Sequence, residues 1–175
     1  MFLDKAFWST YNVYDILAAH YGIISMTNFE LLQKTVLFKG SNSEEIEMAL
    51  ELFQERKIKP NATIFTENMP AEALYIVKSG SVRITMMAHE GEEISLLLLG
   101  PGEFFGELAL VQDDVRLVSA RAESSVEILL ITRKDFHALL ELAPRTASRV
   151  LMVIAKLLAM RVKVYSDRLK DLLLL

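Results

Sequence analysis

The spacing of hydrophobic residues changes twice along this 175-residue chain. In residues 1–38, apolar and aromatic side chains recur every three or four positions, which predicts helices. The first helix carries an aromatic stripe, and a second helix is expected over residues 28–36. That stripe either packs on the body of the domain or offers a docking face to a partner or a membrane surface. It consists of Phe7, Tyr11, Tyr14, Leu17, Ala18 and Tyr21.

A third, short helix is predicted to follow. Ser43 is the expected N-cap because its hydroxyl can accept a backbone N–H, and Glu44 and Glu45 suit the first turn. The apolar face of this helix then comprises Ile46, Ala49, Leu50 and Phe53.

Between Arg56 and Thr132 the pattern is that of short strands. Brief apolar runs are separated by Gly, Pro and Asn, which is typical of antiparallel β structure. Asn61 and Asn68 can adopt the left-handed backbone that turns require. Gly80, Gly91 and Gly102 mark the other turns. The strand candidates are residues 62–65, 73–77, 81–85, 93–97, 118–122 and 126–131.

The last zone is helical again. Residues 134–142 predict a short helix, and the absence of Gly and further Pro after Pro144 predicts one long helix to the end. Its apolar positions form two neighbouring lines, and a helix with two apolar faces packs on its own domain and on a partner. The first line is Val150, Ile154, Leu157, Arg161, Val164 and Arg168; the second is Leu151, Leu158, Tyr165, Leu169 and Leu172.

These patterns divide the chain into three parts: a helical segment over residues 1–38, a β domain with short flanking helices over 39–143, and a C-terminal helix over 144–175. The long helix predicts a homodimer through residues 147–172, with a short contact centred on residues 154–158, because two-fold pairing covers an exposed apolar line. The fold class is therefore mainly β with flanking helices.

Composition narrows the function classes. Hydrophobic residues make up 52% of the chain, enough for a sizeable core, and the net charge of −4 does not favour a nucleic-acid binder. The lack of cysteine excludes disulfides and thiolate metal sites. The N-terminus lacks a signal-peptide pattern, and no apolar run is long enough to span a bilayer, so we expect a soluble, cytoplasmic protein.

The sequence contains no pattern of residues that is typical of a catalytic site. His20, His89 and His137 are scattered, without the spacing of metal ligands or of a Ser-His-Asp arrangement. Asp113 and Asp114 fit a solvated turn. We expect no metal, no catalytic residue and no enzyme activity.

The candidate ligand-binding residues lie within residues 102–122. Gly106 precedes a short helical turn, where free N–H groups can receive an anion and a glycine lets a ligand approach. Arg116 supplies a planar cation suited to a phosphate, and Glu107 can accept hydrogen bonds from sugar hydroxyls. Together these groups indicate a ribose-phosphate ligand.

This stretch resembles the phosphate-binding cassette of cyclic-nucleotide-binding domains. That family includes catabolite-activator-type regulators, protein kinase A regulatory subunits and cyclic-nucleotide-gated channels. The strand-turn-strand at residues 74–82 is also similar, and the resemblance spans residues 30–160. The matching cassette residues are Phe105, Gly106, Glu107, Leu108, Ala109, Leu110 and, after a short loop, Arg116.

The resemblance implies an antiparallel, jelly-roll-like β-roll with N-terminal helices and a long C-terminal helix. In such domains the residue matching Glu107 binds the ribose 2′-hydroxyl, and the residue matching Arg116 binds the cyclic phosphate. Backbone groups near Gly106, Leu108 and Ala109 complete the cradle, and the C-terminal helix covers the base. The expected ligand is cyclic AMP, with cyclic GMP as the alternative.

One departure lies beside the arginine. The family has two small residues there, whereas this chain has Leu117 and Val118, which complete our predicted ligand site with Phe105. Leu117 lacks a hydroxyl that could read a guanine edge, so cyclic AMP should bind at least as well as cyclic GMP. Added volume in a tight site can also exclude the ligand.

Three functions remain open. The favoured one is a regulatory cyclic-AMP-type sensor that signals through its C-terminal helix to an unknown protein partner. The second is a degenerate fold that dimerises or docks proteins, in which Glu107 and Arg116 pair with each other or with Arg83 or Arg121. The third is the effector domain of a transcription regulator. Because the chain ends at Leu175, direct DNA binding is not expected.

Overall fold

The computed structural model describes residues 26–88 and 91–173, so the aromatic stripe of residues 7–21 lies outside it. Helices precede and follow the strands. The helical elements are α3 (Asn28–Lys34), η1 (Val36–Phe38), α4 (Ser43–Leu50), η2 (Glu107–Leu110), α5 (Arg133–Leu142) and α6 (Pro144–Leu173). The strands are β1 (Gln54–Ile58), β2 (Thr63–Phe65), β3 (Ala73–Ser79), β4 (Val82–Met87), β5 (Glu93–Leu99), β6 (Phe104–Phe105), β7 (Ser119–Ala122) and β8 (Val126–Thr132).

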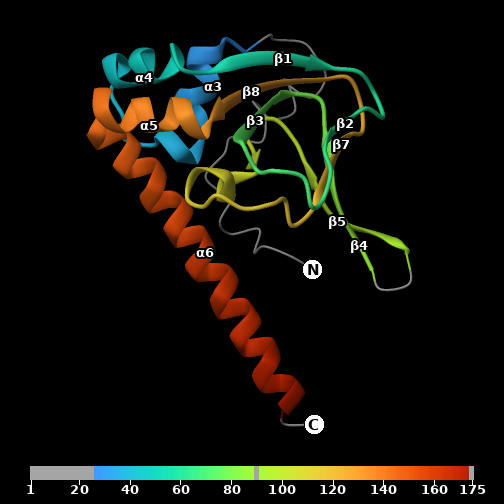
Figure 1. Ribbon diagram of the computed structural model, residues 1–175. Coiled ribbons are helices and arrows are strands. Elements are labelled where there is room, and N and C mark those ends of the chain that lie inside the picture. The colour runs from blue at the N-terminus through green and yellow to red at the C-terminus, as the bar shows by residue number, and fades with distance from the viewer. Residues whose placement is uncertain (1–25, 89–90, 174–175) are drawn as a thin grey trace.

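Within the described residues, the strands form two four-stranded sheets. Their orders are β1-β8-β3-β6 and β2-β7-β4-β5, and every pairing is antiparallel. Apolar side chains from both sheets meet between them, including Val77, Val82, Ile84, Phe105 and Ile128. The predicted β-roll is confirmed (Figure 1).

The sequence analysis did not predict strands β1 and β6, and each omission has a physical reason. β1 is an edge strand that pairs only with β8 among the described strands, and its residues Gln54 to Lys57 are all exposed. Such a strand carries no apolar alternation, and its charges protect the open edge. β6 is only two residues long, too short to give a period.

Two helix boundaries differ from the prediction by a few residues. α4 is capped by Asn42, one residue before Ser43, because Asn42 and Glu45 form a reciprocal capping box. α3 ends at Lys34, and the chain continues through the 3₁₀ turn η1.

The helices form a second core against the outer face of the first sheet. Leu74 and Ile76 of β3 and Leu129 and Ile131 of β8 meet apolar side chains of the helical layer. Those include Leu31, Leu32, Leu37, Phe38, Ile46, Phe136 and Leu139. Figure 1 shows this layer at one end of the roll, where α5 leads directly into α6.

Helix α6 packs on its own domain with its first half and then projects beyond the roll (Figure 1). Val150, Ile154 and Leu157 are buried in the helical core, and Leu158 packs partly against it. Ile154 is only 1% exposed within its own chain, so its side chain is not available to the dimer contact predicted around residues 154–158. The side chains of Tyr165, Leu169 and Leu172 fall outside the described part.

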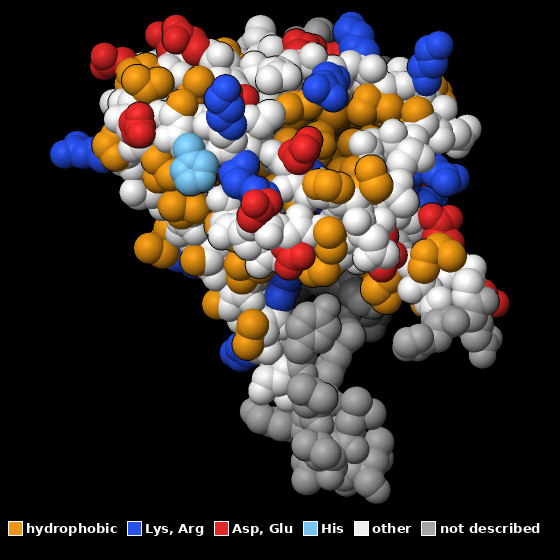
Figure 2. Space-filling view, viewed as in Figure 1, with side chains coloured by type: hydrophobic (Ala, Val, Ile, Leu, Met, Phe, Trp, Pro, Cys, Tyr) orange, Lys and Arg blue, Asp and Glu red, His pale blue; other side chains and the backbone are white. Residues whose placement is uncertain are grey.

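The exposed apolar side chains are distributed over several elements. Figure 2 shows hydrophobic side chains mixed with charged ones on the face it presents. On α6, Met152, Val162 and Val164 are more than half exposed. No described helix has the length and apolar content that a membrane crossing requires.

Candidate functional site

Gly106 forms a tight turn between β6 and η2. Its backbone is left-handed, with φ of 74°. A Cβ atom at this position would lie 2.6 Å from Arg116 Nη1, 2.9 Å from the Ala73 carbonyl oxygen and 3.3 Å from a ring carbon of Tyr75. Only glycine fits both the left-handed backbone and the available space, as predicted for this position of the cassette.

Arg116 lies directly against this turn. Its Nη2 donates to the Ala73 carbonyl at 3.0 Å, and its Nη1 donates to the Gly106 carbonyl at 3.4 Å. The guanidinium carbon stands 4.1 Å from the ring centroid of Phe65 and 5.5 Å from that of Tyr75. Two carbonyls and two aromatic faces therefore fix the orientation of this cation.

The charge of Arg116 is buried and incompletely satisfied. The residue is 5% exposed, and its Nε has no hydrogen-bond partner among the described residues. Burial lowers the pKa of Arg116, while the Tyr75 hydroxyl and the Glu107 carboxylate partly oppose that shift. A guanidinium remains protonated even so, and a buried, partly unpaired cation favours an anionic ligand.

Glu107 is the first residue of η2 and is also buried, at 5% exposed. Its Oε1 accepts a hydrogen bond from Arg161 Nη1 of helix α6 at 2.6 Å. The carboxylate thus connects the cassette to the long helix. Among the described residues, no carboxylate forms an ion pair with Arg116, and Glu107 pairs with Arg161 instead.

Arg133, the first residue of α5, ties the cassette to the helical layer. Its Nε donates to the Ala109 carbonyl at 2.7 Å, and its Nη2 donates to the Ala71 carbonyl at 2.5 Å. Its Nη1 forms an ion pair with Asp113 at 2.6 Å. A displacement of the cassette therefore acts directly on the start of α5.

Three further predicted site residues, Phe105, Leu108 and Ala109, lie in the Gly106 turn or next to it. Phe105 is buried, and its ring stacks on that of Tyr75, with 5.1 Å between the centroids; Tyr75 in turn lies beside Arg116. The Ala109 N–H donates to the Gly106 carbonyl within the turn, and the Leu108 carbonyl accepts from Val111. Phe105, Leu108 and Ala109 thus shape the turn.

Leu117 and Val118, the two residues after Arg116, have different surroundings. Leu117 is 58% exposed, so its extra volume points to solvent. Val118 packs partly against the core between the two sheets. The atoms nearest to a Cβ at Gly106 belong to Arg116, Ala73 and Tyr75, so neither Leu117 nor Val118 is the closest neighbour of that turn.

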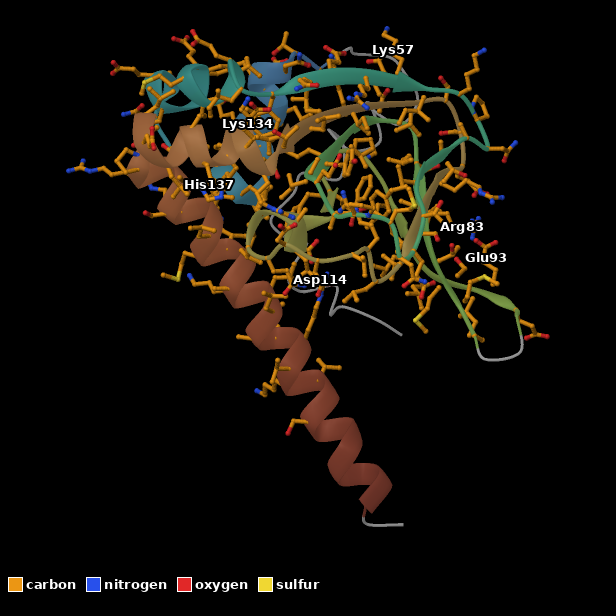
Figure 3. All side chains as sticks on the ribbon, viewed as in Figure 1. Lys57, Arg83, Glu93, Asp114, Lys134 and His137 are labelled. Carbon is orange, nitrogen blue, oxygen red and sulfur yellow. The ribbon has the colours of Figure 1, made fainter. Side chains whose placement is uncertain are left out.

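Among the described residues, the ion pairs that the degenerate-fold hypothesis proposed for Glu107 and Arg116 are not formed. Arg83 forms an ion pair with Glu123 at 2.7 Å, and Figure 3 places Arg83 and Glu93 on the β4–β5 hairpin, away from α6. Arg121 is exposed on β7. His137 is exposed on α5 (Figure 3), and His20 and His89 lie outside the described residues. Within the described residues, no cluster of acidic and histidine side chains could hold a metal ion.

Sequence reasoning missed four contributors to the site: Phe65, Tyr75, Arg133 and Arg161. Phe65 and Tyr75 had the pattern of ordinary strand residues, and their stacking against a cation depends on sheet pairing. Arg133 and Arg161 are distant in sequence from the cassette. The basic character of the last helix was a signal for Arg161, but it did not distinguish this arginine from its neighbours.

The β-roll thus places a buried arginine beside a glycine turn, next to a carboxylate that forms an ion pair with the long C-terminal helix. The model of the cyclic nucleotide-binding domain family matches residues 55–142. This chain belongs to that family.

Two similar bacterial proteins carry receptor and activator names. The chain is 38% identical over 120 residues to the cyclic AMP receptor protein of Thermus thermophilus, covering 69% of this chain and 56% of that protein. The crystal structure of the Thermus thermophilus catabolite activator protein superimposes with a TM-score of 0.71 at 38% identity, covering 79% of this chain and 63% of that one. The chain thus spans less than two thirds of either relative.

A eukaryotic structure is similar as well. The regulatory domain of Toxoplasma gondii protein kinase A, crystallised with cyclic AMP, has a TM-score of 0.59 and 29% identity. The match covers 63% of this chain and 42% of that chain. The likeness therefore extends over the β-roll in both bacterial and eukaryotic regulators.

Proposed function

We propose that this chain is a cyclic-AMP-type sensor whose ligand binds at Gly106, Glu107 and Arg116 and whose signal passes through helix α6. The observation that carries the proposal is the state of Arg116. It is a buried cation fixed by two carbonyls, with an unsatisfied Nε and no carboxylate partner among the described residues. A cyclic phosphate would supply the missing negative charge.

The charges around the turn suit a ligand with one negative charge. Arg116 and Arg161 contribute two positive charges, and Glu107 contributes one negative charge. Arg133 is balanced by Asp113. A cyclic nucleotide carries a single phosphate charge that would compensate the buried cation of Arg116, with its ribose hydroxyl near Glu107.

Two connections offer a route for the signal. Arg133 joins the cassette to α5, and Arg161 joins Glu107 to α6. Ligand contacts that differ between two positions of the cassette would shift the population of helix positions. The output would be the position of α6, presented to a second copy of the chain or to another protein.

A second candidate is the effector domain of a transcription regulator. The supporting observation is that two similar proteins carry receptor and activator names and are longer than the matched region. In that case α6 would pass the signal to a further domain. Sequencing the natural coding region around this chain, followed by DNA-binding measurements on its product, tests this candidate.

Calorimetric titration with cyclic AMP and cyclic GMP, after removal of copurified ligand by unfolding and refolding, tests the main proposal. We expect cyclic AMP to bind, and to bind at least as tightly as cyclic GMP, because Leu117 offers no hydroxyl beside Arg116. Absence of binding by both nucleotides would instead support the degenerate docking module. A clear preference for cyclic GMP would contradict the selectivity.

A further inference from the structure

Three aromatic rings from different strands form a cluster beside Arg116. The ring of Tyr75 is stacked on that of Phe105, with 5.1 Å between the centroids, and Phe65 lies 5.6 Å and 5.8 Å from these two rings. The guanidinium carbon of Arg116 stands 4.1 Å from the Phe65 centroid and 5.5 Å from that of Tyr75. Phe65 therefore makes the closer of the two ring contacts with this buried cation.

The contact with Phe65 stabilises a positive charge without using a hydrogen-bond donor. The negative face of an aromatic ring attracts a guanidinium, most strongly where water is excluded. The N–H groups of Arg116 are used elsewhere: Nη2 donates to Ala73 and Nη1 to Gly106, and Nε has no partner among the described residues. The ring thus fixes the cation while the Nε–H remains available to an anion.

Holding Arg116 in place has an energetic consequence for a ligand. An arginine side chain has many rotamers, and ordering it on binding costs free energy. The carbonyls that hold the guanidinium belong to β3 and to the Gly106 turn, whereas Phe65 belongs to β2 on the second sheet. Loss of the ring would remove that second attachment, so a ligand would have to order a more mobile guanidinium.

We propose that Phe65 is a positioning residue for the ligand's phosphate: its ring holds the Arg116 guanidinium in the orientation that meets the anion, in the free and the bound state alike. This inference rests on the proposed function. Because the contact persists on binding, loss of the ring should lower nucleotide affinity. If the phosphate instead drew Arg116 away from the ring, the contact would compete with the ligand, and its loss would raise affinity.

The first test is a calorimetric titration of the full chain and two variants with cyclic AMP. Phe65→Leu keeps an apolar side chain against the core between the sheets but removes the ring face. We expect its affinity to fall about fivefold to tenfold, the range of a partly desolvated contact between a cation and a ring. Phe65→Tyr retains an aromatic face and should bind within about twofold of the unsubstituted chain. An unchanged or higher affinity in Phe65→Leu, or an equal loss in Phe65→Tyr, would overturn the proposal.

The matched control is Phe53→Leu, which makes the same change in the core formed by the helices. Phe53 is partly buried there, and its ring meets that of Phe38 edge-on, with 5.9 Å between the centroids. Both substitutions remove packed volume and should lower the thermal unfolding temperature. Only Phe65→Leu should lower affinity. Equal losses of affinity would show that loosened packing is responsible, and would overturn the role of the ring contact.

Fluorination separates the charge of the ring from its shape. Trifluorophenylalanine in place of Phe65 keeps the ring outline but withdraws electron density from its face, which weakens the attraction for a cation. Cyclic AMP affinity should fall by about threefold or more. A fluorinated chain that binds as tightly as the unsubstituted chain would overturn the proposal. If Phe65→Leu does not fold, the fluorinated chain takes its place in each measurement.

A measurement without ligand keeps the inference separate from the proposed function. In NMR spectra of the free chain, the Nε–H signal of Arg116 is identified by its loss in Arg116→Lys, and its exchange with water is followed. Phe65→Leu should speed this exchange at least about threefold, because the guanidinium moves more freely, whereas Phe53→Leu should leave it unchanged. Unchanged exchange in Phe65→Leu would overturn the positioning role. Failure of the unsubstituted chain to bind either nucleotide, despite the expected exchange rates, would overturn the proposed function, and with it the role of Phe65 toward a phosphate.

Discussion

The guanidinium carbon of Arg116 lies 4.1 Å from the ring centroid of Phe65. This contact joins the cassette to β2, on the second sheet, while the hydrogen bond from Nη2 to Ala73 joins it to β3 on the first. The cation is therefore held by both sheets before any ligand arrives. If the proposed phosphate binds here, little conformational entropy would be lost at this side chain, because it is already ordered.

Replacement of this arginine should abolish nucleotide recognition. Arg116→Lys keeps a positive charge but loses the planar fork that reaches Ala73 and Gly106. We expect cyclic AMP affinity to fall at least about thirtyfold, the effect of disrupting a buried charged contact. Arg121→Lys, an exposed change on β7, is the control and should bind normally. Equal affinity in both variants would contradict the role of Arg116.

Gly106 and Gly102 offer a matched pair for the role of space in the turn. Both backbones are left-handed, with φ of 74° and 85°, so alanine strains either one by about 1–2 kcal/mol. A Cβ at Gly102 meets nothing within 4 Å, whereas a Cβ at Gly106 collides with Arg116 and Ala73. Gly106→Ala should therefore lose clearly more free energy of unfolding in urea than Gly102→Ala, and only Gly106→Ala should lose nucleotide binding. Equal losses of stability would show that the close approach has no energetic effect.

Glu103, at the turn before β6, should make stability depend on pH. Burial raises the pKa of its carboxyl above the usual value of 4.5, while a hydrogen bond from the Gly100 N–H partly opposes the shift. The folded state then binds the proton more tightly than the unfolded state, so this group lowers stability as pH rises from 4.5 through the raised pKa. Glu103→Gln should raise the urea midpoint at pH 7 but not below pH 4.5. An advantage that persists in acid would contradict this account.

Much of the fold was predictable because its signals are local. The six predicted strands and the last two helices correspond to short apolar runs, turn residues and an uninterrupted helical stretch. Asn61 and Asn68 do have positive φ, as their residue type suggested. β1 escaped prediction because its residues face solvent, so nothing in its sequence alternates.

The site was predictable only in part. The order of Gly106, Glu107 and Arg116 in the cassette is a local pattern. The partners of these residues are not local: Ala73 and Arg161 lie 43 and 54 positions away from the residues they contact. Such contacts depend on how sheets and helices pack, which no single-sequence pattern encodes.

The last prediction concerns assembly through the outer side of helix α6, which the structure relocates away from Ile154. Exposed small and apolar residues recur there at alternating intervals of four and three, the spacing of a coiled-coil seam. They are Ser148, Met152, Ala155, Ala159 and Val162. Met152 and Val162 are 57% and 67% exposed, and small neighbours allow two helices to approach closely. A second copy related by a two-fold axis would cover both side chains at once.

We therefore expect a homodimer that the double change Met152→Glu and Val162→Glu converts to a monomer without loss of the fold, because neither side chain is buried in its own chain. Light scattering measures the mass, and thermal unfolding checks the fold. Lys156→Glu, which places an acidic group on an exposed position beside this seam, is the control and should remain dimeric. An unsubstituted chain that stays monomeric at micromolar concentrations would refute the dimer. It would also leave α6 to signal through a different protein, because no second copy would then respond to its position.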